Sequence, residues 1–93
     1  MDVKRIKQRA MAEVDRLQAE MNEIAHQIHQ DPEVGWETPR AAGRLSDFLE
    51  AHGLKVERAV AGLSSSFRAY PEHRFRARPG IALLAEYDAL PGL

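Results

Sequence analysis

The chain has 93 residues, a formal net charge of −1 and 44% hydrophobic residues, which is typical of one small globular domain. A charge near zero argues against a nucleic-acid-binding protein, and the lack of cysteine excludes disulfides and thiolate metal ligands within these residues. No apolar stretch approaches the roughly 18 residues of a membrane span and no secretory signal opens the chain, so a cytoplasmic location is expected.

The first predicted element is a long helix over residues 2–29, with Asp2 as its N-terminal cap. Its apolar residues recur at alternating spacings of three and four and line one face. They are Val14, Leu17, Met21, Ile24 and Ile28, with Ile6 and Ala10 extending the stripe. The stripe predicts packing on a sheet, and a short coiled coil is the alternative. His26 and His29 could chelate a metal on this helix, but neither has a third ligand nearby.

Asp31-Pro32 ends this helix, because the residue before a proline avoids the helical region. Trp36 falls in the loop that follows and is expected to fold back onto the core. A second helix is predicted over residues 38–52, opened by a Thr38 cap and Pro39. Its expected buried face is formed by Ala41, Ala42, Leu45, Phe48, Leu49 and His52, and Gly53 is the expected left-handed terminator.

Three strands are predicted to follow, near residues 54–60, 65–70 and 80–86. The first alternates, with Leu54 and Val56 facing inward. The third contains a continuous apolar run from Ile81 to Ala85, which is typical of a strand buried on both faces. The predicted fold class is therefore α/β, with two N-terminal helices followed by three strands in a single partial domain over residues 1–93.

An arginine-rich segment, residues 68–78, separates the second and third predicted strands. Arginines interleaved with aromatic residues can bind single-stranded nucleic acid or phosphate. Because the overall charge is near zero, we expect instead a solvated hairpin loop and no nucleic-acid partner.

Two carboxylates, Glu86 and Asp88, follow the third predicted strand directly. In open α/β sheets, active sites gather just beyond the carboxyl ends of the strands. These two residues are the candidate site residues of the chain, and the alternative is a solvated strand end.

Several stretches together resemble the start of a known enzyme family. They are Ile28-His29-Gln30-Asp31-Pro32-Glu33, Gly35-Trp36-Glu37, Leu49-Glu50-Ala51-His52-Gly53 and Ala85-Glu86-Tyr87-Asp88-Ala89-Leu90-Pro91-Gly92. In this respect the chain is similar to the N-terminal segment of the metal-dependent amidohydrolases and carboxypeptidases. This family includes aminoacylases, indole-acetyl-amino-acid hydrolases and aminobenzoyl-glutamate hydrolase. Residues 64–79 depart from the family pattern.

The resemblance implies an incomplete portion of a zinc-peptidase-like catalytic domain. In full-length relatives, two zinc or manganese ions polarise the carbonyl of an amide next to a carboxylate, and a glutamate moves the proton. The substrate would be a small N-acyl amino acid or peptide. Asp88 matches a carboxylate that orients a metal-ligating histidine and raises its basicity. Glu86 stands where many relatives carry a histidine ligand and where the amidohydrolase branch carries an acid.

The Gly-His-x-Cys-Gly-His element that supplies ligands in the amidohydrolase branch has no counterpart in these residues, and neither does the general-base glutamate. Two carboxylates alone cannot hold a tight zinc pair, so the isolated chain is expected to bind metal loosely at best and to be inactive. The alternative is a non-enzymatic protein that associates with itself or a partner through the helix at residues 14–28 or through the sheet edge.

Overall fold

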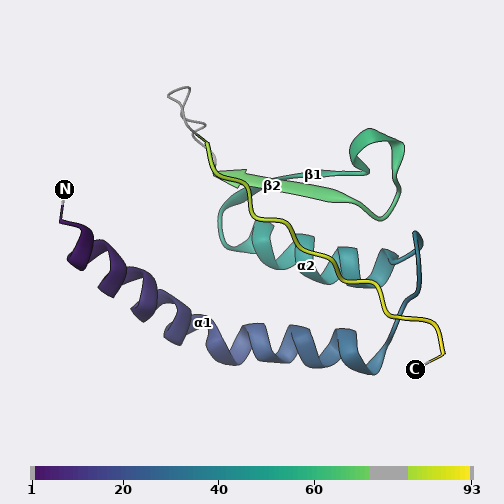
Figure 1. Ribbon diagram of the computed structural model, residues 1–93, viewed down its shortest axis with the longest axis horizontal. Helices are drawn as coiled ribbons and strands as arrows, with labels where there is room; N and C mark the ends of the chain where they lie inside the picture. The colour runs from purple at the N-terminus through teal and green to yellow at the C-terminus, as the bar shows by residue number, and fades with distance from the viewer. Residues whose placement is uncertain (1, 72–79, 93) are drawn as a thin grey trace. The chain divides into compact units, whose positions relative to one another are not determined.

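The computed structural model describes residues 2–71 and 80–92 (Figure 1). The elements are helix α1 (Val3–Gln30), helix α2 (Pro39–Ala51), strand β1 (Leu54–Arg58), a short 3-10 turn η1 (Val60–Gly62) and strand β2 (Phe67–Pro71). The predicted order of two helices followed by strands, and the mixed α/β class, are confirmed. The strand count differs, since the described residues contain a two-stranded sheet and not three strands.

The chain divides into two compact units, Met1–Gln30 and Asp31–Leu93. The first unit contains α1. The second contains α2, the two strands and the segment that carries Glu86 and Asp88. The site described below lies entirely within the second unit.

Helix α1 begins where the sequence predicted. The Asp2 carboxylate accepts a hydrogen bond from the Arg5 backbone N–H at 3.2 Å, so Asp2 caps the helix as expected. The helix ends at Gln30, just before Asp31-Pro32. None of its residues is buried, and packing of its apolar stripe on a sheet stays a prediction. In the described part of the chain, no helix has both the length and the apolar character needed to cross a membrane.

In the second unit, α2 packs against both strands of the antiparallel β1–β2 ribbon (Figure 1). The register pairs Leu54 with Pro71 and Arg58 with Phe67. The face of α2 that is buried includes Ala41, Ala42 and Ser46. Ser46 tolerates burial because its hydroxyl donates to the Ala42 carbonyl at 2.6 Å, within the helix itself.

The end of α2 agrees with its sequence signals. Gly53 has φ +89°, a left-handed conformation in which a Cβ atom is unfavourable, and its N–H donates to the Glu50 carbonyl at 3.1 Å. His52 was expected on the buried face but is exposed, and its ring lies 4.4 Å from that of Phe48, centroid to centroid.

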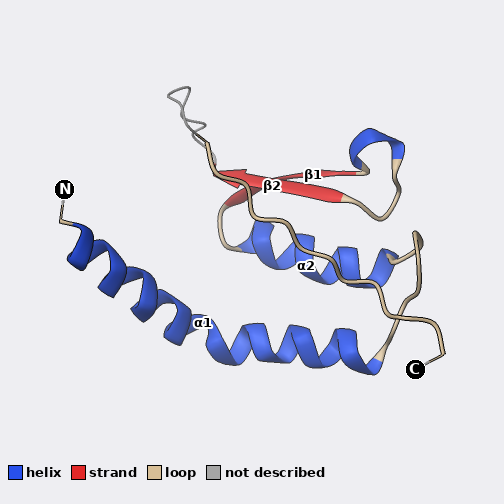
Figure 2. Cartoon of the chain, viewed as in Figure 1, coloured by secondary structure: helices blue, strands red, loops and turns tan. Residues whose placement is uncertain are grey.

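Two expectations about apolar residues are wrong. Residues 80–86 form no strand, and Ile81, Leu83 and Leu84 are more than 90% exposed (Figure 2). A central strand needs partners on both edges and layers over both faces, and the described residues supply neither for this run. Trp36 is 83% exposed instead of covering the core.

Candidate functional site at the start of the second helix

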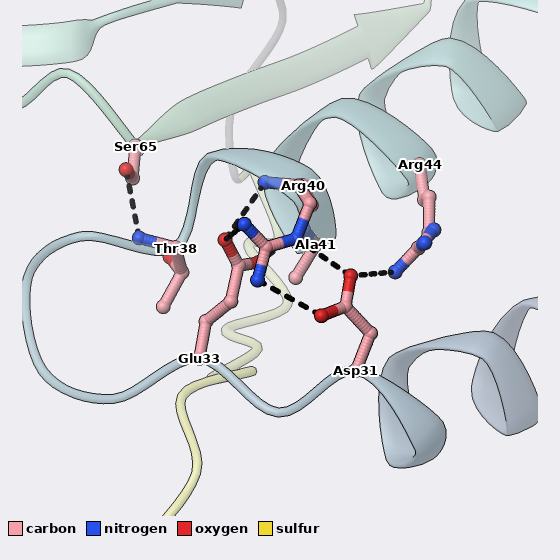
Figure 3. A network of polar contacts seen from close by, with 7 residues as sticks. All are labelled: Asp31, Glu33, Thr38, Arg40, Ala41, Arg44 and Ser65. Carbon is pink, nitrogen blue, oxygen red and sulfur yellow. Dashed lines mark hydrogen bonds and ion pairs between the residues drawn. The ribbon is translucent and has the colours of Figure 1, made fainter.

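Glu33 is a buried carboxylate that is held by hydrogen bonds at the start of α2. Its carboxylate accepts hydrogen bonds from the backbone N–H groups of Arg40, at 3.1 Å, and Ala41, at 2.7 Å (Figure 3). These are two of the N–H groups that the first turn of α2 leaves without a partner in the helix. The side chain is only 4% exposed. Glu33 therefore caps α2 from a position several residues before the helix begins.

The sequence predicted Thr38 as the cap of this helix, and the prediction is confirmed for its position but not for its hydrogen bond. Thr38 does occupy the position before the helix, but its hydroxyl makes no capping hydrogen bond. Its backbone N–H instead donates to the Ser65 Oγ atom at 3.0 Å (Figure 3). Ser65 thus holds the turn before α2 against the loop that precedes β2, and this arrangement leaves the helix start open to Glu33.

Asp31 adds a second acidic contact to the same helix start. Its carboxylate accepts from the Arg40 guanidinium at 2.6 and 2.8 Å and from Arg44 at 3.2 Å (Figure 3). The hydrogen bond from Arg40 is the main reason why the pKa of Asp31 lies below its ordinary value of 3.8, and Arg44 lowers it further. The loop from Asp31 to Thr38 is thereby held at both ends.

The segment that carries the predicted site residues is attached to this loop. The Ala89 N–H donates to the Glu33 carbonyl at 2.7 Å, and Val34 and Ala89 form an isolated parallel bridge. The Tyr87 hydroxyl donates to the Ser65 carbonyl, and the Tyr87 ring stacks on Phe67 with centroids 5.8 Å apart. Burial raises the pKa of the Tyr87 phenol above its ordinary value.

Exposure alternates along the segment, which places Glu86 and Asp88 on its outer side. Tyr87 and Ala89 are half-buried, while Glu86, Asp88 and Leu90 are exposed. In an extended chain, residues two apart share a side. The two carboxylates therefore point away from the anchored face, and no hydrogen bond or ion pair joins either to another described residue.

An open hollow of about 430 Å³ lies beside the Glu33 network. It is lined by Pro32, Glu33, Glu37, Pro39, Arg40, Ser64 and Ser65. The Glu33 carboxylate already occupies the start of α2, and Asp31 holds the guanidinium of Arg40. A second anion would have to displace these carboxylates, so the hollow is not a ready anion site.

The described residues do not fit a tight metal pair. Glu86 and Asp88 offer only oxygen donors, and a structural or catalytic zinc site normally includes imidazole or thiolate. Across residues 2–71 and 80–92, no three or more His, Asp or Glu side chains are placed to hold a metal together. His26 and His29 are both exposed on α1.

Sequence reasoning missed Glu33 and Ser65 because both act over distance. The Thr38-Pro39 pair is the usual local signature of a helix start. Because it predicts the helix start by itself, nothing in the local pattern pointed to the carboxylate of Glu33, which precedes the helix by several residues. The one available signal was Pro32-Glu33 itself, an acid after a helix-ending proline and shortly before a second helix.

Known proteins similar to this chain include two curated hydrolases. The Xaa-Arg dipeptidase of Mus musculus is 35% identical over 95 residues, which cover 95% of this chain and 22% of the dipeptidase. A component of the p-aminobenzoyl-glutamate hydrolase of Escherichia coli is 41% identical over 71 residues, which cover 76% of this chain and 14% of that component. The chain is related to the metal-dependent amidohydrolases and peptidases.

This relation to the amidohydrolase and peptidase family agrees with the resemblance of the sequence motifs. The chain spans less than a quarter of the length of each of the two relatives, at 22% and 14%. No profile of a known protein family matches the chain, and no solved structure does.

Proposed function

We propose that these 93 residues are part of the catalytic domain of a two-metal hydrolase that cleaves an amide bond next to a carboxylate. The observation that carries the proposal is similarity to a dipeptidase across 95% of the chain. The anchored Glu86–Asp88 segment supports it, because a fixed segment that presents two carboxylates is suited to form one wall of an active site.

The substrate class is a small N-acyl amino acid or peptide. One relative is named as a dipeptidase and the other as part of a p-aminobenzoyl-glutamate hydrolase. A dipeptide and p-aminobenzoyl-glutamate share one feature, an amide bond beside a free carboxylate. The proposed substrate class is defined by that shared feature and not by the name of either relative.

In this proposal, Asp88 orients a histidine from outside these residues by accepting its ring N–H. Glu86 lies on the same outer side of the segment and contributes negative charge to the same region. Tyr87 and Ala89 hold the segment in place through Ser65 and Glu33. Glu33 would then be a positioning residue, because it fixes the site without touching substrate.

The family relation implies zinc or manganese, whose ligands would lie outside these 93 residues. Since the described donors do not fit a tight metal pair, no catalytic step is assigned to them. The isolated chain is accordingly proposed to be inactive. A cytoplasmic location and the absence of a nucleic-acid partner stay predictions. Within the arginine-rich segment, Arg68 forms an ion pair with Glu57. Residues 72–79 of that segment lie outside the described residues.

The test compares the native protein with the 93-residue chain. We expect the species isolated from its own cells to exceed the 10.5 kDa of this chain and to hydrolyse a dipeptide with C-terminal arginine or p-aminobenzoyl-glutamate. Activity should fall on chelation and return with zinc or manganese. The purified chain should be inactive under all conditions.

Three results would contradict the proposal. A native species of 10.5 kDa would show that the chain is not part of a larger domain. A heavier species with no amide hydrolysis on a panel of N-acyl amino acids and dipeptides would remove the hydrolase assignment. Turnover by the purified chain would show that its own residues suffice for catalysis.

A further inference from the structure

Helix α1 carries an apolar stripe that is most exposed over its first half. At 100° per residue, six of the nine apolar side chains from residue 3 to residue 21 fall within about 80° of arc. These six are Val3, Ile6, Ala10, Val14, Leu17 and Met21, and the other three, Met11, Ala12 and Ala19, lie outside the arc. Val3 is 57% exposed, Ile6 48% and Val14 57%, while Leu17 and Met21 are half-buried. Such a stripe on an α-helix is the usual contact surface for another helix.

The charges on α1 are divided along its length. Residues 3–12 carry four basic side chains and no acidic one. Residues 13–23 carry four acidic side chains and a single basic one, Arg16, which forms an ion pair with Glu13. The helix therefore has a basic half and an acidic half along the same apolar stripe.

For two copies of this helix, the division of charge favours one orientation over the other. Two parallel copies would place basic halves together and acidic halves together, whereas two antiparallel copies place each basic half on an acidic half. With Ala10 opposite Val14 of the second copy, Val3 falls opposite Met21 of that copy, so the two stripes also match. Antiparallel pairing further aligns the helix dipoles favourably.

We propose that α1 is a homodimerisation helix, in which two copies of this chain pair antiparallel through residues 3–21. The overlap is about 28 Å long, at 1.5 Å per residue. It places the contact nearer the N-terminus than the self-association predicted from residues 14–28. The pairing does not depend on the proposed hydrolase function and stands or falls separately from it.

The first test is the solution mass of the 93-residue chain by sedimentation equilibrium at low salt. We expect twice 10.5 kDa at micromolar concentration. Val14→Asp places a charge in the stripe and should raise the dimer dissociation constant at least about tenfold. Ala19→Asp adds the same charge on the opposite face of α1 and should leave the constant unchanged. Circular dichroism checks that both variants keep their helix.

The second test uses charge exchange to establish the orientation. One variant replaces Lys7 and Arg9 by Glu, and the other replaces Glu13 and Glu20 by Lys, because these charges lie closest to the stripe within residues 3–21. Each alone should dimerise at least about tenfold more weakly than wild type, and a mixture of the two should recover dimer formation. The recovery should weaken as salt rises above about 0.1 M, where charges are screened.

Three outcomes overturn the proposal. A monomeric wild-type chain would mean that other residues of the same chain cover the stripe, or that nothing does. Equal effects of Val14→Asp and Ala19→Asp would remove the stripe as the contact. A mixture of the charge variants that stays monomeric would exclude antiparallel pairing.

Discussion

At the scale of single residues, Glu33 shows how a buried charge is tolerated. Burying an ionised carboxylate without partners is strongly unfavourable. Glu33 is 4% exposed, but both of its oxygens accept backbone N–H groups and the Arg40 guanidinium lies 3.8 Å away. Its backbone carbonyl also accepts from Ala89. One residue therefore joins the start of α2 to the segment of the proposed site.

Replacing Glu33 by Ala tests this role. The change leaves two backbone N–H groups of the first turn without their acceptor, so the free energy of unfolding should fall by about 1–3 kcal/mol. Urea denaturation followed by circular dichroism measures the loss. Glu37→Ala is the matched control, because Glu37 is exposed, and should change the value by less than about 0.5 kcal/mol. Equal losses would mean that Glu33 is not the effective cap.

The lowered pKa of Asp31 predicts how the stability of the chain depends on pH. Its pKa is lowered from 3.8 chiefly by the hydrogen bond from Arg40, so the unfolded chain binds this proton more readily than the folded chain does. The stability it contributes is present above about pH 4 and is lost as the pH falls through the lowered folded-state value.

Asp31→Asn removes the carboxylate that binds a proton when the chain unfolds at low pH. The variant should therefore lose less stability than wild type on acidification. The measurement is the urea midpoint at a series of pH values from about 5 down to about 2. Identical slopes for the two proteins would show that Asp31 is not the group responsible. Arg44→Gln, which keeps the Arg40 contact, should flatten the curve less than Asp31→Asn does.

At the scale of elements, the local sequence pattern correctly predicted the order of the two helices and the first two strands. It also predicted a third strand that the described residues do not form. The stop at Asp31-Pro32, the proline at position 39 and Gly53 are local signals, and each marks a real boundary. The run from Ile81 to Ala85 is equally apolar, but a strand exists only where another strand pairs with it. No described strand does so.

Leu83→Ala distinguishes the observed exposure from the buried strand that the pattern predicted. Leu83 is 95% exposed, so the change should alter the free energy of unfolding by less than about 0.5 kcal/mol. A buried leucine would lose about 2–5 kcal/mol on the same change. Phe67→Ala is the comparison, because Phe67 is half-buried against Tyr87, and it should cost more than Leu83→Ala does. A loss above about 2 kcal/mol for Leu83→Ala would contradict the exposed conformation.

At the scale of the whole molecule, the chain buries little apolar surface. The buried hydrophobic residues of the described part are Ala41 and Ala42, and the remaining buried residues are polar. They are Glu33, Thr38, Ser46 and Ser65. The fully buried residues are therefore mostly polar, and each hydrogen bond that they make contributes about 1 kcal/mol net.

The isolated chain should consequently be weakly stable. We expect a free energy of unfolding below about 5 kcal/mol, at the low end for folded domains. Urea denaturation at 25 °C and low protein concentration gives the value without a contribution from self-association. A value above about 10 kcal/mol would show that the chain buries more apolar surface than its described residues do.

The sequence by itself determined the α/β class, both helices, their stops and the family relation, because these depend on residue type and short spacing. The tertiary structure alone decided that Glu33 and not Thr38 caps α2, that Ser65 holds both Thr38 and Tyr87, and that the Ile81–Ala85 run is exposed. Each of these depends on which distant segments meet. A pattern of neighbouring residues does not contain that information, because hydrogen-bond and strand partners are chosen by the fold of the whole unit.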